Sequence, residues 1–179
     1  MPLPVLGFTI WISQPAGWHS AVGGLLLGVG LGMRGWAVAH IGPASRTRSD
    51  EVRRLVYTGP YELTRNPLYL ANLVLYAGAG LMTARLGWAL GLVAFMFVHY
   101  SLVVRWEEWN LEQKLGEVFR SYRNRVPRWL GSAAPVHAAA PREHADVRWP
   151  RALGSERSTV LAVALLAAAI LVRGGLAGA

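Results

Sequence analysis

Long apolar stretches with almost no charge constrain this chain more than any other feature. In the stretch 18–41 the single formal charge is Arg34, and a helix of about 20 such residues crosses the hydrocarbon core of a bilayer. Two more apolar runs, 68–84 and 86–104, are separated by Arg85 alone, so we expect them to form a tight antiparallel hairpin. The sequence therefore predicts an all-α protein with several membrane helices.

Two further segments complete the predicted bundle. The run that ends at Arg173 is short, and it spans only if this arginine reaches the lipid headgroups. The opening residues 2–13 lack the charged region and cleavage site of a signal peptide, and they fit either a short embedded helix or a buried segment that does not span. The predicted fold is one integral-membrane domain, a polytopic transmembrane bundle of about four to five helices. Residues 131–158 form its connecting loop and residues 159–173 its C-terminal membrane helix.

Positive charge is concentrated on one side of this predicted bundle. The chain is 53% hydrophobic and carries a net charge of +8. Five arginines lie in 42–66, and nine arginines and Lys114 lie in 105–158, whereas the hairpin tip holds only Arg85. The positive-inside rule places both rich segments in the cytoplasm, next to the anionic headgroups of the cell membrane. The basic composition is thus explained without nucleic acid as a partner.

Glycines recur at helical spacing within the apolar runs. One stripe holds Gly24, Gly28 and Gly32, and another holds Gly87 and Gly91. Small residues at this spacing let membrane helices approach closely. We therefore expect these five positions to lie at helix contacts.

The segment 53–72 carries the densest set of candidate functional residues. After a Gly-Pro turn at 59–60, Asn66 occupies a favourable N-cap position and Pro67 the first position of a helix. One interpretation is a well-capped helix start. The other is a docking site for an anionic group beside Arg65, because the first turn of a helix presents free N–H groups.

A second dense segment, 105–129, follows the third apolar run. Glu107 and Glu108 point in different directions on a helix, so at most one of them can face the bundle. One interpretation is that Glu108 pairs with a neighbouring arginine, and the other is that Glu107 holds the ammonium group of a ligand. Because the hairpin returns to the same membrane face, the helix start at Asn66 and the carboxylate of Glu107 can converge on one site. The same segment shows one apolar helical face, formed by Leu111, Leu115, Val118, Phe119 and Tyr122.

Together these segments resemble the C-terminal core of the integral-membrane methyltransferases typified by isoprenylcysteine carboxyl methyltransferase and the phospholipid N-methyltransferases. The matching residues are GPYELTRNPLY at 59–69 and EEWNLEQKLGEVFRSYRNRVPRW at 107–129. The family pattern is a G-x-Y-x-x-x-R-H-P-x-Y box followed by a Glu-Glu pair. The resemblance covers about residues 53–130, which it marks as the catalytic core.

The resemblance implies S-adenosylmethionine as the cofactor, bound in a pocket on the cytoplasmic face. It places Glu107 at the amino-acid end of the cofactor, and Arg65, Glu108 and Arg105 are the predicted catalytic residues. The other predicted cofactor-binding residues are Arg53, Leu55, Val56, Tyr61, Asn66, Pro67 and Tyr69. The acceptor implied is a lipid-like, prenylated or other amphiphilic molecule, methylated on a carboxylate or an amine.

Two departures from the family pattern leave the acceptor open. Asn66 replaces the box histidine, which removes a titratable nitrogen, and Val103 stands where many relatives have an arginine associated with substrate. His99 and Tyr100 could line the point where cofactor and acceptor meet, although a histidine hydrogen-bonded to a neighbouring helix is the favoured interpretation. The chain lacks cysteine, and its histidines lack ligand spacing, so we assign no metal. Two other functions remain open: an NADPH-dependent membrane reductase of the sterol or enoyl type, and a non-catalytic membrane paralogue.

Overall fold

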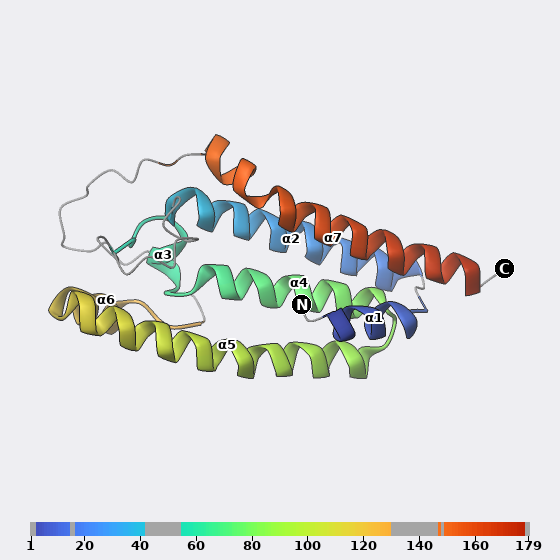
Figure 1. The fold of residues 1–179 in the computed structure, drawn as a ribbon, viewed down its shortest axis with the longest axis horizontal. Helices are drawn as coiled ribbons and strands as arrows, with labels where there is room; N and C mark the ends of the chain where they lie inside the picture. Colours follow the sequence, from blue (N-terminus) through green and yellow to red (C-terminus); the bar gives the residue numbers. More distant parts are fainter. Residues whose placement is uncertain (1–2, 15–16, 42–54, 130–146, 148, 178–179) are drawn as a thin grey trace. The chain divides into compact units, whose positions relative to one another are not determined.

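The protein is almost entirely helical in a computed structural model, which describes residues 3–14, 17–41, 55–129, 147 and 149–177. No β-strand occurs among these residues, so the all-α prediction is confirmed. Figure 1 shows the helices α1 (Leu3–Trp11), α2 (Gly17–Ile41), α3 (Pro60–Leu63), α4 (Pro67–Met82), α5 (Leu86–Leu115), α6 (Glu117–Arg125) and α7 (Trp149–Ala177).

Three of these helices are long and apolar enough to cross a membrane. They are α2, α5 and the segment Ala152–Gly175 of α7, whereas α4 is a shorter apolar helix of 16 residues. The C-terminal helix begins at Trp149, so residues 149–158 are helical and not part of the expected connecting loop. A proline at position 150 fits this early start, because the first turn of a helix tolerates its missing N–H group.

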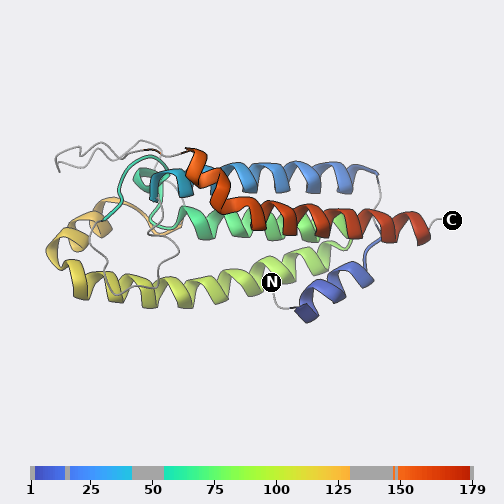
Figure 2. The ribbon, with the colours of Figure 1, turned by 45° about the horizontal axis from the view of Figure 1, so that its top comes forward.

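The chain folds as two compact units. Unit 1 consists of Met1–Gly32, Ala71–His99 and Glu156–Ala179, and unit 2 consists of Met33–Leu70 and Tyr100–Ser155. In unit 1, α2, α4 and α7 lie side by side (Figure 2). Their contact is a core of Leu27, Leu75, Ala79, Met82 and Ile170.

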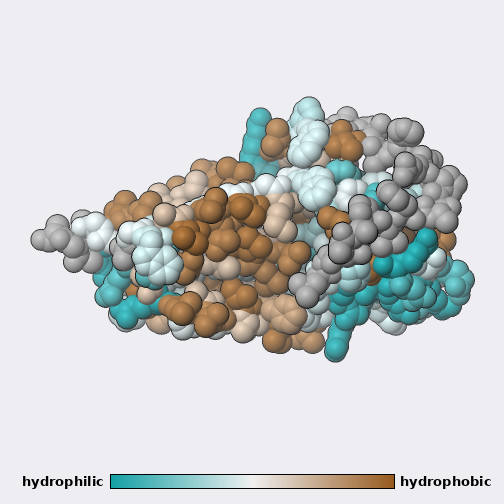
Figure 3. All heavy atoms as spheres, turned by 180° about the vertical axis from the view of Figure 1, so that it is seen from behind, coloured by the Kyte–Doolittle hydropathy of each residue, from teal (hydrophilic) through white to brown (hydrophobic). Residues whose placement is uncertain are grey.

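Large apolar side chains also cover the outside of unit 1. Leu25, Leu90 and Leu165 are each more than half exposed, and Figure 3 shows hydrophobic surface gathered over the helices of this unit. Exposed apolar area of this extent is unfavourable in water and matches the hydrocarbon of a bilayer. Unit 1 therefore has the surface of a lipid-embedded bundle.

Two glycines of α2 allow its close approach to α4 within unit 1. A Cβ atom at Gly23 would lie 2.7 Å from the carbonyl oxygen of Gly78, and one at Gly30 would lie 2.7 Å from Cδ2 of Leu75. The prediction for the glycine stripes was wrong, because a Cβ at any of the five expected positions meets open space. Gly24 lies one residue after the contact position 23, and one residue rotates a side chain by about 100° around a helix.

Unit 2 contains a sharp turn that the sequence pattern did not reveal. Gly116 has φ 52°, a left-handed conformation that favours glycine, and it separates α5 from α6. Phe119 and Tyr122 then pack with Leu111 and Leu115 as expected. Val118 is 62% exposed, so its place on the predicted apolar face was wrong: the turn gives α6 a new direction and ends the single helical repeat.

The glycine contact in unit 1 yields a paired stability prediction. We expect Gly23→Val to lower the free energy of unfolding by about 1–3 kcal/mol, because the new side chain overpacks the contact with the backbone of α4. The matched substitution Gly24→Val, on the open face, should leave it unchanged. Thermal unfolding of the detergent-purified protein measures both, and equal midpoints for the two variants would contradict the packing described here.

Candidate functional site

The predicted site residues gather in unit 2, where the segment before α4 lies against the chain that follows α6. The backbone N–H of Arg65 donates to the carbonyl oxygen of Pro127 at 2.9 Å. Thr64 Oγ1 and the side-chain amide of Asn66 both donate to the carbonyl oxygen of Arg128, each at 3.1 Å. Three consecutive residues are thus fixed to two consecutive carbonyl groups.

Asn66 occupies the expected position at the start of α4. The helix begins at Pro67, and the Asn66 carbonyl oxygen accepts the N–H of Leu70 at 3.1 Å. Its side-chain amide is engaged by the carbonyl of Arg128. Asn66, which replaces the histidine of the family pattern, therefore holds the start of α4 against the chain after α6. This contact needs a hydrogen-bond donor but no side chain that changes its protonation state.

Glu108 forms a buried ionic cluster with two arginines. Its carboxylate accepts hydrogen bonds from Arg128, with Nη2–Oε2 at 2.6 Å and Nε–Oε2 at 3.1 Å. Nη1 of Arg65 lies 3.4 Å from Oε1. Burial lowers the pKa of Arg65 while Glu108 opposes that shift, and the hydrogen bonds that Arg128 donates to Glu108 raise the pKa of Arg128. Of the two interpretations given for the carboxylate pair, pairing with an arginine applies to Glu108.

The neighbouring carboxylate has a different environment. The hydroxyl of Tyr69 donates to Oε1 of Glu107 at 2.7 Å, and the Tyr69 ring lies 4.9 Å from the ring of Tyr100 between centroids. Glu107 is half-buried, and no lysine or arginine of the described residues forms an ion pair with it. A half-buried carboxylate without a cation is costly. An ammonium group brought by a ligand would remove that cost.

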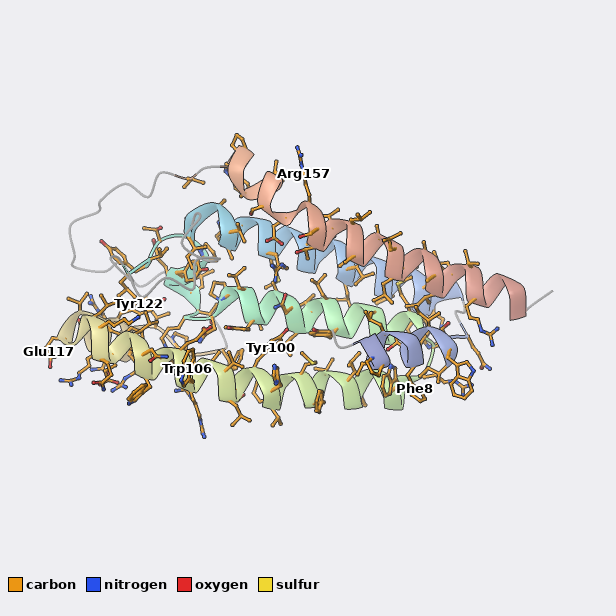
Figure 4. The ribbon with its side chains drawn as sticks, in the orientation of Figure 1. Phe8, Tyr100, Trp106, Glu117, Tyr122 and Arg157 are labelled. Atoms are coloured by element: carbon orange, nitrogen blue, oxygen red, sulfur yellow. The ribbon has the colours of Figure 1, made fainter. Side chains whose placement is uncertain are left out.

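A second polar group in unit 2 lacks a partner. Tyr61 is 6% exposed, and its buried hydroxyl has no hydrogen-bond partner in the described part of the chain. The hydroxyl of Tyr122, labelled in Figure 4, donates to the backbone carbonyl of Tyr61 at 2.7 Å and so holds this residue in place. Burial raises the pKa of Tyr61, so its hydroxyl remains a donor at neutral pH. Buried polar groups are almost always satisfied, so the Tyr61 hydroxyl has an unused hydrogen-bonding capacity within the described chain.

The remaining predicted residues differ in their placement. Leu55 packs against the cluster of Phe119, Tyr122 and Val126, and Val56 is half-buried beside it in sequence. Pro67 is buried at the start of α4. Arg105 is exposed, as is Trp106 next to it (Figure 4). Arg53 lies outside the described residues.

Sequence reasoning missed Arg128, Tyr122 and Thr64 as residues that build the site. Arg128 comes directly after Pro127, and a proline soon after a helix predicts that the helix has ended. This position close behind the end of α6 was the sequence signal that could have pointed to Arg128. Tyr122 was assigned to the apolar face alone, although a buried tyrosine hydroxyl usually finds a partner. The partners of all three are backbone carbonyl groups or a carboxylate distant in sequence.

The ionic cluster gives a stability prediction. Glu108→Gln leaves the buried guanidinium of Arg65 without a counter-charge, and we expect a loss of about 3 kcal/mol in the free energy of unfolding. Glu117→Gln is the control, because Glu117 also pairs with an arginine but is exposed. Chemical unfolding in detergent compares the two variants. An unchanged midpoint for Glu108→Gln would show that the cluster does not hold unit 2 together.

Comparisons with known proteins identify a family and two similar curated proteins. The family model described as phospholipid methyltransferase matches residues 18–118. The chain is 36% identical over 104 residues to a nickel-cobalt-cadmium resistance protein, NccN, of Alcaligenes xylosoxydans xylosoxydans, a match that covers 57% of this chain and 46% of the relative. It is 35% identical over 100 residues to a cobalt-zinc-cadmium resistance protein, CzcN, of Cupriavidus metallidurans, covering 54% and 46%.

These matches span slightly less than half the length of either curated relative. No solved structure matches the chain. The family match covers more than half of the chain, including α2, α4, the box and the Glu107–Glu108 pair. The chain belongs to the phospholipid methyltransferase family.

Proposed function

We propose that the protein is a membrane methyltransferase that uses S-adenosylmethionine to methylate an amphiphilic acceptor. The observation that carries the proposal is the carboxylate of Glu107, which is half-buried, oriented by Tyr69 and without a cation in the described chain. A methyl donor that ends in an amino acid supplies the missing ammonium group. The family match supports the same reaction class.

The residues around Glu107 suit the rest of this cofactor. The unpartnered hydroxyl of Tyr61 would donate to one of its oxygen atoms, and Leu55, Val56 and Pro67 offer apolar surface. When bound, the cofactor supplies an electrophilic methyl group on a sulfonium sulfur. The protein then has to bind the cofactor and the acceptor, align the acceptor atom with the methyl group, and exclude water. These are the main contributions of a protein to a displacement of this kind.

Arg65 and Glu108 act in this proposal as positioning residues. Their ion pair joins the segment just after α3, the short helix that carries Tyr61, to the turn of α5 that carries Glu107. Arg105 is exposed one residue before Trp106, where a cation suits the headgroup of an anionic acceptor. We infer from the arginine distribution that the site faces the cytoplasm and that the acceptor enters from the bilayer.

The group at position 66 limits how the acceptor can be activated. The Asn66 amide is held by the Arg128 carbonyl and removes no proton. An acceptor that is already ionised, such as a carboxylate, needs no base. An amine has to lose its proton first, and Asn66 offers no base for that step.

The names of the two relatives raise a second candidate, a part in resistance to divalent metals. In the described ranges, no group of three His, Asp or Glu side chains is arranged to hold a metal ion. We therefore favour a contribution through methylation of a membrane component over direct metal binding. Calorimetric titration with cobalt tests the direct alternative.

Cofactor binding is the test of the proposed function. We expect saturable binding of S-adenosylmethionine and of its demethylated product to the detergent-purified protein, measured by calorimetry. Glu107→Gln removes the charge and should weaken binding at least about tenfold, as expected for loss of a charge-assisted hydrogen bond. Tyr61→Phe should weaken it less, and Glu117→Gln, on the exposed face of α6, should bind like the wild type.

The opposite outcomes are equally informative. If NADPH binds and the methyl donor does not, the protein is a reductase of the same membrane architecture. If the folded protein binds neither, it is a non-catalytic member of the family. If Glu107→Gln binds S-adenosylmethionine with the affinity of the wild type, the cofactor site does not include Glu107, whichever reaction the protein catalyses.

A further inference from the structure

Unit 1 contains a cavity of about 700 Å³ whose lining residues play no part in the site described above. It lies where the end of α1 meets the start of α5 and the end of α7, and Trp11, Arg85, Trp88 and Arg173 are among its lining residues. A volume of this size accommodates a small ligand or a lipid headgroup.

The polar groups of this cavity select for negative charge. Arg85 and Arg173 line it, and no aspartate or glutamate among the described residues does. Nε1 of Trp88 is buried and has no hydrogen-bond partner in the part of the chain that the structure describes. Gly87 and Trp88 also belong to the first turn of α5, where backbone N–H groups lack helical acceptors. Two arginines and the residues that carry these donor groups thus line the same space.

Three aromatic side chains, those of Phe8, Trp11 and Trp88, also line the cavity. The Phe8 ring, labelled in Figure 4, lies 4.8 Å from the ring of Trp88 and 5.8 Å from that of Trp11, between centroids. Trp11 is 67% exposed, and tryptophans with an exposed face are typical of the level at which lipid headgroups meet hydrocarbon. A ligand here therefore combines an anionic head with an apolar body.

We propose that this cavity binds the phosphate group of an anionic phospholipid. The two arginines and the indole N–H of Trp88 hold the phosphate, and the acyl chains continue over the exposed apolar surface of unit 1. This is a lipid site separate from the group formed by Tyr69 and Glu107, and it does not depend on the proposed methyl transfer.

The test uses native mass spectrometry of the full-length protein in detergent, titrated with dihexanoyl phosphatidylglycerol. Arg85→Gln combined with Arg173→Gln should weaken binding at least about tenfold, since each removes a charge-assisted contact. Trp88→Phe keeps the ring, removes the N–H donor and should weaken binding by a smaller factor. Arg157→Gln is the matched control, because Arg157 is an exposed arginine of α7 that does not line the cavity.

Two further ligands distinguish the sources of the anion. Dihexanoyl phosphatidylcholine, which has no net charge, should bind more weakly than phosphatidylglycerol, and inorganic phosphate should not compete at equal concentration. Inorganic phosphate that binds as tightly as the lipid would overturn the lipid assignment. Wild-type affinity in both Trp88→Phe and the double variant would overturn the site itself, and the single Trp88→Phe variant keeps the test valid if the double variant does not fold.

Discussion

The buried carboxylate of Glu108 is the interaction on which unit 2 depends. It joins Arg65 from the loop before α4 to Arg128 from the chain after α6. The same two segments are also joined by hydrogen bonds, which Thr64, Arg65 and Asn66 donate to the carbonyl groups of residues 127–128. Two segments more than sixty residues apart in sequence are thereby held together. Glu107, the adjacent residue on α5, then lies within reach of the Tyr69 hydroxyl.

This arrangement explains how neighbouring carboxylates take different roles. Glu108 is satisfied by two arginines, which makes it a structural anion, whereas Glu107 has only the Tyr69 hydroxyl and no cation in the described chain. The Tyr61 hydroxyl adds a hydrogen-bond donor that has no acceptor in the described chain. Neither group is fully satisfied within the described chain, and the zwitterionic methyl donor that we propose would complement both. In that proposal, water exclusion and alignment account for catalysis without a titratable box residue.

The sequence was sufficient for the features that depend on composition and local chemistry. Apolar length identified α2, α5 and the C-terminal span, and the Asn-Pro pair marked the start of α4. The sequence was insufficient where a tertiary contact determines which face of a helix is buried. Gly23, and not Gly24, faces α4, because the packing of neighbouring helices sets how α2 is turned about its own axis. The turn at Gly116 and the role of Arg128 escaped for the same reason, since both depend on where a distant segment lies. The residues of the box and the Glu pair do share unit 2.

The most direct measurement is ultraviolet crosslinking of radiolabelled S-adenosylmethionine to the detergent-purified protein, followed by mapping of the labelled peptide. Our account predicts that the label lies in the part of unit 2 that holds Tyr61 and Tyr69 or the turn of α5 around Glu107, and that excess demethylated product prevents labelling. A label confined to unit 1, or one that the product does not displace, would contradict the assignment of the methyl-donor site.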